Sequence, residues 1–267
     1  MNKSYILKKK TFLEVHSSGE KNKKPALLFL HGAGAHPIQF QKQLCFFSQK
    51  YFVLSIGLHG HSSYFKEKQY KSEDFKLPKL AEDVLYVLNE TGVEKVHLVG
   101  NSAGGLTGFE MIKKSPETIQ SLVTFGTCPK LSYPSWIVKM ISKTDERMIR
   151  KKPEKYLRFT AKQSTPHSAV ANEIVSLMMD SKHVAHLIRA NIGNYNYLDL
   201  LTELRIPYLI IRGRYDKSIN KCLKKVEKVI EANEKIRVAD FAQSGHFANL
   251  DECDLFNSTV MEFIENV

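Results

Sequence analysis

The chain has 267 residues, of which 43% are hydrophobic, so it can bury a substantial core as one domain with an insertion. No apolar window approaches the length that spans a bilayer, and the four cysteines lack the Cys-x-x-Cys spacing of a zinc or disulfide framework. These features exclude a transmembrane protein and a disulfide-stapled one. We expect a cytoplasmic protein that contacts no membrane.

The net charge of +11 is concentrated in two segments of the chain. Residues 1–24 carry seven Lys against two Glu, and residues 131–164 carry nine Lys or Arg against three acidic residues. Neither segment has the interleaved aromatics or the motifs of a nucleic-acid-binding surface. We therefore expect solvated, lysine-rich surfaces and no nucleic-acid partner.

Strand-like and helix-like stretches alternate over the first half of the chain. Such alternation predicts right-handed crossovers and a parallel sheet. Strands are expected at residues 5–15, 25–30, 51–58, 96–101 and 119–125, with helices at 77–89 and from 103 to about 115. After an interruption, strands are expected at 207–211 and 236–241, and helices at 218–232 and 253–264.

The interruption, residues 129–202, has no strand-like run and several amphipathic stretches. It predicts a helical cap inserted into a core made of residues 1–128 and 203–267. Three cap helices are expected, beginning at Pro134, at the Ser164-Thr165-Pro166 cap and at His183. We expect the first to pack Trp136, Ile137, Met140 and Ile141 onto the core, and its Arg147, Arg150, Lys151 and Lys152 to face solvent.

One motif stands between a β-branched run and a helical pattern: Gly100-Asn101-Ser102-Ala103-Gly104. Strand, sharp turn and helix in this order place a serine in a strained backbone conformation and lift its hydroxyl clear of the sheet. The glycines are expected because a Cβ there would collide with the neighbouring strand or helix. Ser102 is therefore the candidate nucleophile.

Two further loops that follow buried strands carry groups that a serine nucleophile needs. A serine hydroxyl needs an adjacent base, and the base needs a carboxylate to orient it. His246 and Asp216 fill these roles, in the chain order Ser, Asp, His that this turn predicts. Asp240, Asp251 and Glu252 are weaker candidates for the carboxylate, because they fall within a strand or at the start of the last helix.

With these motifs, the sequence resembles the α/β-hydrolase superfamily over nearly its whole length. The matching segments are 30–34, 60–62, 98–105, 213–216 and 245–247. The resemblance implies a mostly parallel, doubly wound, eight-stranded sheet and an oxyanion hole made by the N–H groups of Ala33 and Ala103. One departure is Ile56-Gly57-Leu58, where the family commonly has Pro-Asp, and it leaves the packing of that loop open.

We therefore expect a serine hydrolase that cleaves a carboxylic ester or related small acyl substrate and needs no metal or organic cofactor. The same scaffold supports thioesterases, lactonases, carbon–carbon bond hydrolases and cofactor-free haloperoxidases. A ligand receptor that keeps the triad without turnover is an alternative of another class. The substrate and the oligomeric state stay open at this stage. His167, His183 and His186 of the cap are expected to be ordinary helix-face residues.

Overall fold

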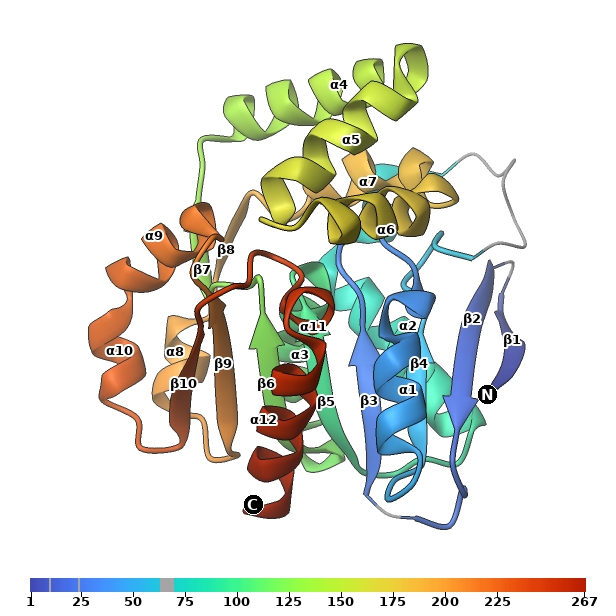
Figure 1. The fold of residues 1–267 in the computed structure, drawn as a ribbon, viewed down its shortest axis with the longest axis vertical. Coiled ribbons are helices and arrows are strands. Elements are labelled where there is room, and N and C mark those ends of the chain that lie inside the picture. The colour runs from blue at the N-terminus through green and yellow to red at the C-terminus, as the bar shows by residue number, and fades with distance from the viewer. Residues whose placement is uncertain (10, 24, 63–69) are drawn as a thin grey trace.

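The computed structural model describes residues 1–9, 11–23, 25–62 and 70–267. Within this part of the chain, eight strands form one sheet in the order β1-β2-β4-β3-β5-β6-β9-β10 (Figure 1). Their bounds are β1 (Asn2–Lys8), β2 (Thr11–Ser18), β3 (Ala26–Leu30), β4 (Val53–Ile56), β5 (Val96–Asn101), β6 (Ile119–Phe125), β9 (Tyr208–Gly213) and β10 (Ile236–Phe241). All neighbours pair in parallel except β1 with β2 and β2 with β4. The expected eight-stranded, mostly parallel sheet is confirmed.

Helices cover both faces of this sheet. One face packs against α2 (Leu77–Glu90), α3 (Ala103–Lys114), α8 (Leu198–Thr202), α9 (Lys217–Lys225) and α10 (Glu227–Glu231). The other packs against α1 (Gln41–Phe47) and α12 (Cys253–Glu265), with the short α11 (Ala248–Asp251) at its upper end (Figure 1). Short 3-10 helices lie at Pro37–Phe40, Ser72–Phe75 and Pro116–Thr118.

The strand β3 shows how the sequence builds two cores from one strand. Its five residues are all buried, and successive side chains point to opposite faces of the sheet. Leu28 and Leu30 enter the core beneath α2 and α3, whereas Leu27 and Phe29 enter the core beneath α1 and α12. A continuous apolar run is therefore what this position requires.

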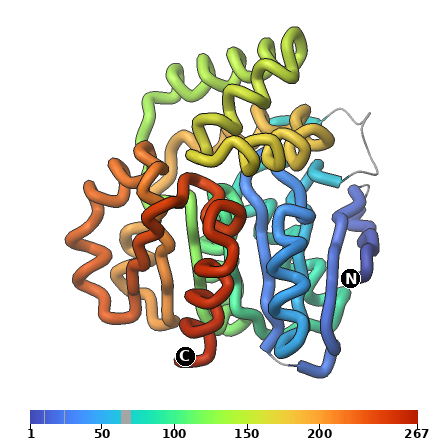
Figure 2. The backbone as a smooth tube through the Cα atoms, in the orientation of Figure 1, coloured from blue at the N-terminus to red at the C-terminus, as the bar shows by residue number. Residues whose placement is uncertain are grey.

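Between β6 and β9 the chain holds, besides α8, four helices that lie across the carboxyl ends of the strands (Figure 2). They are α4 (Ser135–Lys151), α5 (Pro153–Ser164), α6 (Ser168–Met179) and α7 (Lys182–Arg189). The expectation that this segment has no strand is wrong, because β7 (Lys130–Ser132) pairs antiparallel with β8 (Asn194–Asn196). This ladder joins the two ends of the insertion. The boundaries predicted at residues 129 and 202 stay a prediction.

Several predicted elements differ from the observed ones in extent. The strand expected at 5–15 is two strands, β1 and β2, which pair antiparallel, and Lys10 lies outside the described residues. The helix expected at 218–232 divides at Val226 into α9 and α10. The cap helix expected from Ser164 begins at Ser168, because α5 occupies the chain up to Ser164. Among the described residues, no helix combines the length and apolar character needed to cross a membrane.

Phe256 provides a test of the core between the sheet and α12. Its side chain is fully buried and packs edge-on against Phe125, with ring centroids 5.0 Å apart. Phe256→Ala is expected to lower the free energy of unfolding by about 3–5 kcal/mol, since it removes buried area and leaves a cavity. Urea denaturation measures this loss. Val238→Ala, at a 43% exposed position on β10, is the control and should change stability by about 0.5 kcal/mol or less. A similar loss of stability in both variants would contradict the placement of Phe256 in the buried core.

Candidate active site

The turn from β5 into α3 has the geometry that the sequence predicts. Ser102 has a φ of 51° and a ψ of −114°, in a region that non-glycine residues rarely occupy. A Cβ at Gly100 would lie 2.5 Å from the nitrogen of Gly105, and one at Gly104 would lie 2.2 Å from the carbonyl oxygen of Leu30. Both glycines are therefore required for α3 to pack this closely on the sheet.

His246 and Asp216 meet at the same edge of the sheet. Asp216 follows β9, and His246 lies in the loop after β10. The Nδ1 of His246 lies 2.6 Å from Oδ2 of Asp216, so Nδ1 donates to the carboxylate and Nε2 is left as a proton acceptor. Burial raises the pKa of the Asp216 carboxyl, but the charge and hydrogen bond of His246 outweigh it and lower that pKa below its ordinary value.

Backbone contacts bring Ser102 and His246 into one site. The Ser102 N–H donates to the carbonyl of Phe125 at 2.9 Å, and a Cβ built on the next residue, Gly126, would lie 2.9 Å from the His246 ring. Asn101 Nδ2 donates to the His246 carbonyl at 3.0 Å. Within the described residues Ser102 Oγ makes no hydrogen bond to His246, so the hydroxyl must turn toward Nε2 before it can transfer a proton.

The predicted oxyanion donors lie on two loops that meet at Ser102. Ala103 is the first residue of α3, and Ala33 lies in the loop after β3. A Cβ at Gly32 would be 3.2 Å from the Cβ of Ser102, which places that loop against the serine. In the described part of the chain, neither the Ala33 nor the Ala103 N–H donates to another protein group. Both donors are thus available to a developing negative charge.

Two histidines in loops at the strand ends, His31 and His61, hold the Ala33 loop in place. The Nε2 of His61 accepts a hydrogen bond from the Gly34 N–H at 2.9 Å, and His31 Nε2 accepts one from the Leu58 N–H at 3.1 Å. Burial lowers the pKa of His31 to about 3 and lowers the pKa of His61 well below its ordinary value. Both rings are therefore neutral acceptors. The only signal in the sequence was the recurrence of histidine beside glycine at two strand ends.

The carboxylates set aside in the sequence analysis have other partners. Asp240 makes two hydrogen bonds to the guanidinium of Arg212, which lies beside it on β9. Asp251 accepts the Gly245 N–H at 2.7 Å, and Glu252 accepts the Ser244 hydroxyl at 2.7 Å. Asp251 and Glu252 thus fix the loop that carries His246. None of the three bonds to the His246 ring.

The cap lies directly over the loop of Ala33. A Cβ at Gly34 would be 2.7 Å from Ala185 of α7 and 3.3 Å from Cε of Met178 at the end of α6. At the other side of the site, the His246 N–H donates to the carbonyl of Ser164 at 2.7 Å. Helices α5, α6 and α7 therefore supply the wall above the serine.

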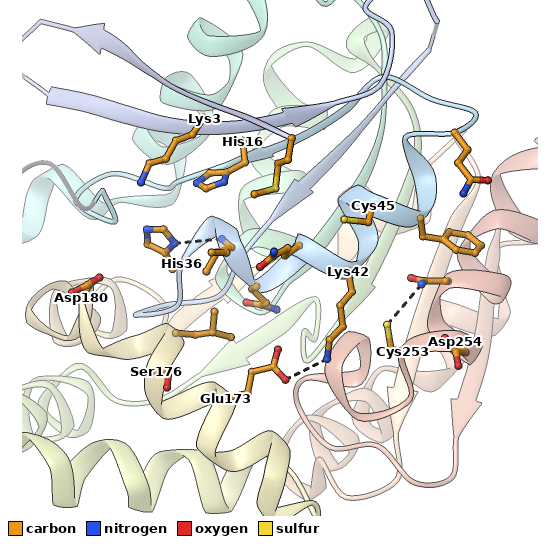
Figure 3. A pocket seen from close by; sticks show the side chains of 18 residues that line it. Lys3, His16, His36, Lys42, Cys45, Glu173, Ser176, Asp180, Cys253 and Asp254 are labelled. Atoms are coloured by element: carbon orange, nitrogen blue, oxygen red, sulfur yellow. Dashed lines mark hydrogen bonds and ion pairs between the residues drawn. The ribbon is translucent and has the colours of Figure 1, made fainter.

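Glu14, His16 and His36 form a buried group that could be considered as a metal site. Figure 3 shows the two histidines of this group. Glu14 Oε1 lies 2.6 Å from His16 Nε2, 3.4 Å from His36 Nε2 and 2.9 Å from Lys3 Nζ. Because the Ile38 N–H donates to His36 Nδ1 at 3.3 Å, His36 carries its proton on Nε2 and directs it at the carboxylate. This pattern fits a carboxylate held by N–H donors. A metal would need the other tautomer of His36.

The pocket drawn in Figure 3 lies beside this group and separate from the serine. It runs between the start of the chain, the 3-10 helix that leads into α1, and α6 of the cap, and Lys42 and Glu173 form an ion pair of 3.4 Å across it. Its lining residues include neither Ser102 nor Asp216 nor His246. It is therefore a cleft between core and cap, distinct from the candidate active site.

Comparisons with known proteins agree with this architecture. The chain is 25% identical over 267 residues to a 2-hydroxy-6-oxononadienedioate/2-hydroxy-6-oxononatrienedioate hydrolase of a Pseudomonas species. The aligned region covers 94% of this chain and 91% of that protein. A crystal structure of a hydrolase from Pseudomonas aeruginosa superimposes with a TM-score of 0.83 at 19% identity and covers 98% of each chain. A thermophilic esterase from Thermogutta terrifontis gives a TM-score of 0.82 at 16% identity, covering 100% of this chain and 99% of that one. Residues 25–252 match the family model described as the alpha/beta hydrolase fold, and the chain belongs to this family.

Proposed function

We propose that the protein is a serine hydrolase that cleaves a carboxylic ester or a related small acyl compound through an acyl-enzyme on Ser102. The observation that carries this proposal is the serine at positive φ beside the bonded pair of His246 and Asp216. A hydroxyl on a strained turn, an imidazole beside it and a carboxylate that orients the imidazole are the three groups that acyl transfer needs. The fold is that of a hydrolase family, whereas the ester substrate is our inference.

In the first half of the reaction, Ser102 Oγ attacks the substrate carbonyl and His246 Nε2 takes the hydroxyl proton. The carbonyl oxygen gains negative charge, which the Ala33 and Ala103 N–H groups stabilise by hydrogen bonds. His246 then gives its proton to the leaving alcohol as the carbon–oxygen bond breaks. Asp216 keeps the ring oriented and stabilises the imidazolium that forms between these steps.

In the second half, water attacks the acyl-enzyme. His246 Nε2 removes a proton from the water as its oxygen bonds to the acyl carbon, and the same two N–H groups hold the oxyanion. The proton returns to Ser102 Oγ as the ester bond to the serine breaks, which releases the carboxylic acid. Apart from water and the substrate, every group that this cycle uses belongs to the five residues named.

Other acyl substrates are chemically compatible with the same residues. Ser102 and the two N–H donors would serve equally in the hydrolysis of thioesters or lactones, in the cleavage of the carbon–carbon bonds of some diketones, and in peracid formation. The similarity to the dioate hydrolase of Pseudomonas supports a second candidate function, the hydrolysis of a negatively charged substrate or of a carbon–carbon bond. A ligand receptor would bind an acyl compound at the same serine without releasing a product.

The location of the protein in the cell is part of the proposal. All four cysteines are free, and Cys128 is buried. Free thiols in this number favour a reducing compartment, so we propose the cytoplasm.

Ser102→Ala tests the nucleophile. The variant removes only the attacking oxygen, so it should fold normally and lower the turnover of p-nitrophenyl esters by about 10³-fold or more. A fluorophosphonate probe should label the wild type at Ser102 and leave the variant unlabelled. A panel of esters of increasing acyl length then defines the substrate class. Equal rates in wild type and variant would refute the proposal, and a stable ligand complex without turnover would favour the receptor.

The pH dependence of kcat/KM tests the base. Because the pKa of Asp216 is held below its ordinary value, this carboxylate stays ionised throughout the range in which histidines titrate. Protonation of the His246 imidazole alone should then reduce kcat/KM by about tenfold per pH unit on the acid side. Stopped-time assays from pH 4 to 9, with circular dichroism at each pH, measure the slope. A flat profile, or a slope of two protons, would contradict a single histidine base.

His61→Ala tests the positioning of the Ala33 loop. The substitution removes the acceptor of the Gly34 N–H, so the oxyanion donor becomes less ordered and kcat should fall by about 10–100-fold with little change in KM. His59→Ala is the matched control in the same loop, since the His59 ring bonds to Asp83 at 3.0 Å and not to the Ala33 loop. An equal loss of kcat in both variants would show a general packing effect.

A further inference from the structure

The outer face of α4 is the largest departure from what the sequence predicts. Trp136 is 65% exposed, Met140 54% and Ile141 40%, so the expectation that these side chains pack onto the core is wrong. Exposed aromatic and thioether side chains on one helix are unusual in a surface that only needs to be solvated. The neighbouring helix α5 adds Phe159, which is 66% exposed.

The inner face of α4 explains why its apolar residues point outward. Asp145 and Ile149 are the buried residues of the helix, and Asp145 forms an ion pair of 3.0 Å with Arg189 of α7. The Ser142 hydroxyl donates to the carbonyl of His186 at 3.0 Å. Positions 142, 145 and 149 share one side of a helix, and Trp136, Met140 and Arg147 lie on the opposite side. Figure 2 shows α4 as the outermost helix of the cap, farthest from the sheet.

The same outer surface is strongly cationic. A shallow groove along α4 and the start of α5 is lined by Trp136, Met140, Thr144 and Met148 together with Lys139, Lys143, Arg147, Lys151, Lys152 and Lys155. No Asp or Glu lines this groove, and none of its six cations forms an ion pair with any residue that the structure describes. Like charges packed this closely repel one another, so an anionic partner would relieve the repulsion.

We propose that the outer face of α4 attaches the protein to the surface of an anionic phospholipid bilayer. A helix with basic side chains and a tryptophan on its free face lies in the interfacial plane of a membrane, where apolar groups enter the acyl boundary and cations meet the headgroups. The expectation of no membrane contact rested on the lack of a spanning segment, which does not bear on surface attachment.

Charge and apolarity together select this partner over others. A nucleic acid would neutralise the six cations but would leave Met140 without an apolar layer to enter. A second copy of the chain would bring the same positive surface against itself. Anionic lipid satisfies both features, since phosphate groups lie above a layer of hydrocarbon. Attachment through α4 would place the cap next to the bilayer and the amino-terminal edges of the strands away from it (Figure 1).

Trp136 is the only tryptophan in the chain, so its fluorescence reports directly on this face. The experiment mixes the full-length protein with vesicles of pure phosphatidylcholine or of equimolar phosphatidylcholine and phosphatidylglycerol. With the anionic vesicles we expect co-sedimentation, a blue shift of the emission and protection from acrylamide. The pure phosphatidylcholine vesicles should cause none of these changes. Raising the salt concentration to about 0.5 M should weaken binding at least tenfold.

Charge reversal on the helix tests the assignment to α4. The triple variant Lys143→Glu, Arg147→Glu, Lys151→Glu should lower the partition coefficient by about 100-fold or more while circular dichroism stays unchanged. The matched control, Lys221→Glu, Lys225→Glu, Lys228→Glu, makes the same change in net charge at exposed positions of α9 and α10 and should bind nearly as well as wild type. Equal losses in the two variants would overturn the proposal, because binding would then follow net charge alone.

The apolar part of the face is tested separately. Met140→Ser keeps every charge and should reduce partitioning by about threefold to tenfold, since it removes apolar area from the interface. No binding of the wild type at low salt would refute the proposal. Binding of DNA that is tighter than binding of vesicles, without a shift of the Trp136 emission, would replace it with a nucleic-acid surface. Self-association lost in the α4 triple variant would replace it with an interface between copies. All these measurements can be repeated in Ser102→Ala, so they do not depend on the proposed chemistry.

Discussion

The backbone at Ser102 is the constraint on which the rest of the site depends. A positive φ in a serine costs free energy, and the structure keeps it because the turn is fixed from both sides. Gly104 lets the first turn of α3 touch the carbonyl of Leu30, and the Ser102 N–H is bonded to β6. Removing either contact would let the serine relax into an ordinary turn. The hydroxyl would then no longer stand above the sheet where His246 and the N–H donors converge.

The loops around the serine are held by polar side chains that take no direct part in acyl transfer. Asp251 and Glu252 accept hydrogen bonds from the loop of His246, and His61 accepts one from the loop of Ala33. Burial lowers the pKa of His61 well below its ordinary value, so its ring stays a neutral acceptor, and burial raises the pKa of Asp251, against the hydrogen bonds that this carboxyl accepts from Thr165 and Gly245. These side chains serve the site by fixing the positions of His246 and the Ala33 N–H, since a donor that moves by about 1 Å loses much of its effect on the transition state.

The eight-stranded sheet was implied by the family resemblance. Local patterns in the sequence predicted most of its strands, the turn at Ser102 and the pairing of His246 with Asp216. Each rests on a signal within a few residues: a buried apolar run, a Gly-x-Ser-x-Gly turn, or a polar residue directly after a strand. The role of His61 was missed because its partner Gly34 lies 27 residues away. The strands β7 and β8 were missed because three residues are too few to show a periodicity. Both depend on tertiary contacts that no short window contains.

Helix α4 shows the limit of such patterns most clearly. Helical periodicity predicted a helix there, and the helix exists, but periodicity does not say which side is covered. The covered side is chosen by the ion pair of Asp145 with Arg189 and by the burial of Ile149, which dock α4 on α7. Once those contacts are made, Trp136 and Met140 must face away from the cap, because they project from the side of the helix opposite to Asp145 and Ile149. A helix that only shielded the active site could carry its apolar side chains inward at no cost. Trp136 therefore faces outward among cations that pair with no acidic residue in the part of the chain that the structure describes, and this arrangement is independent of the chemistry at Ser102.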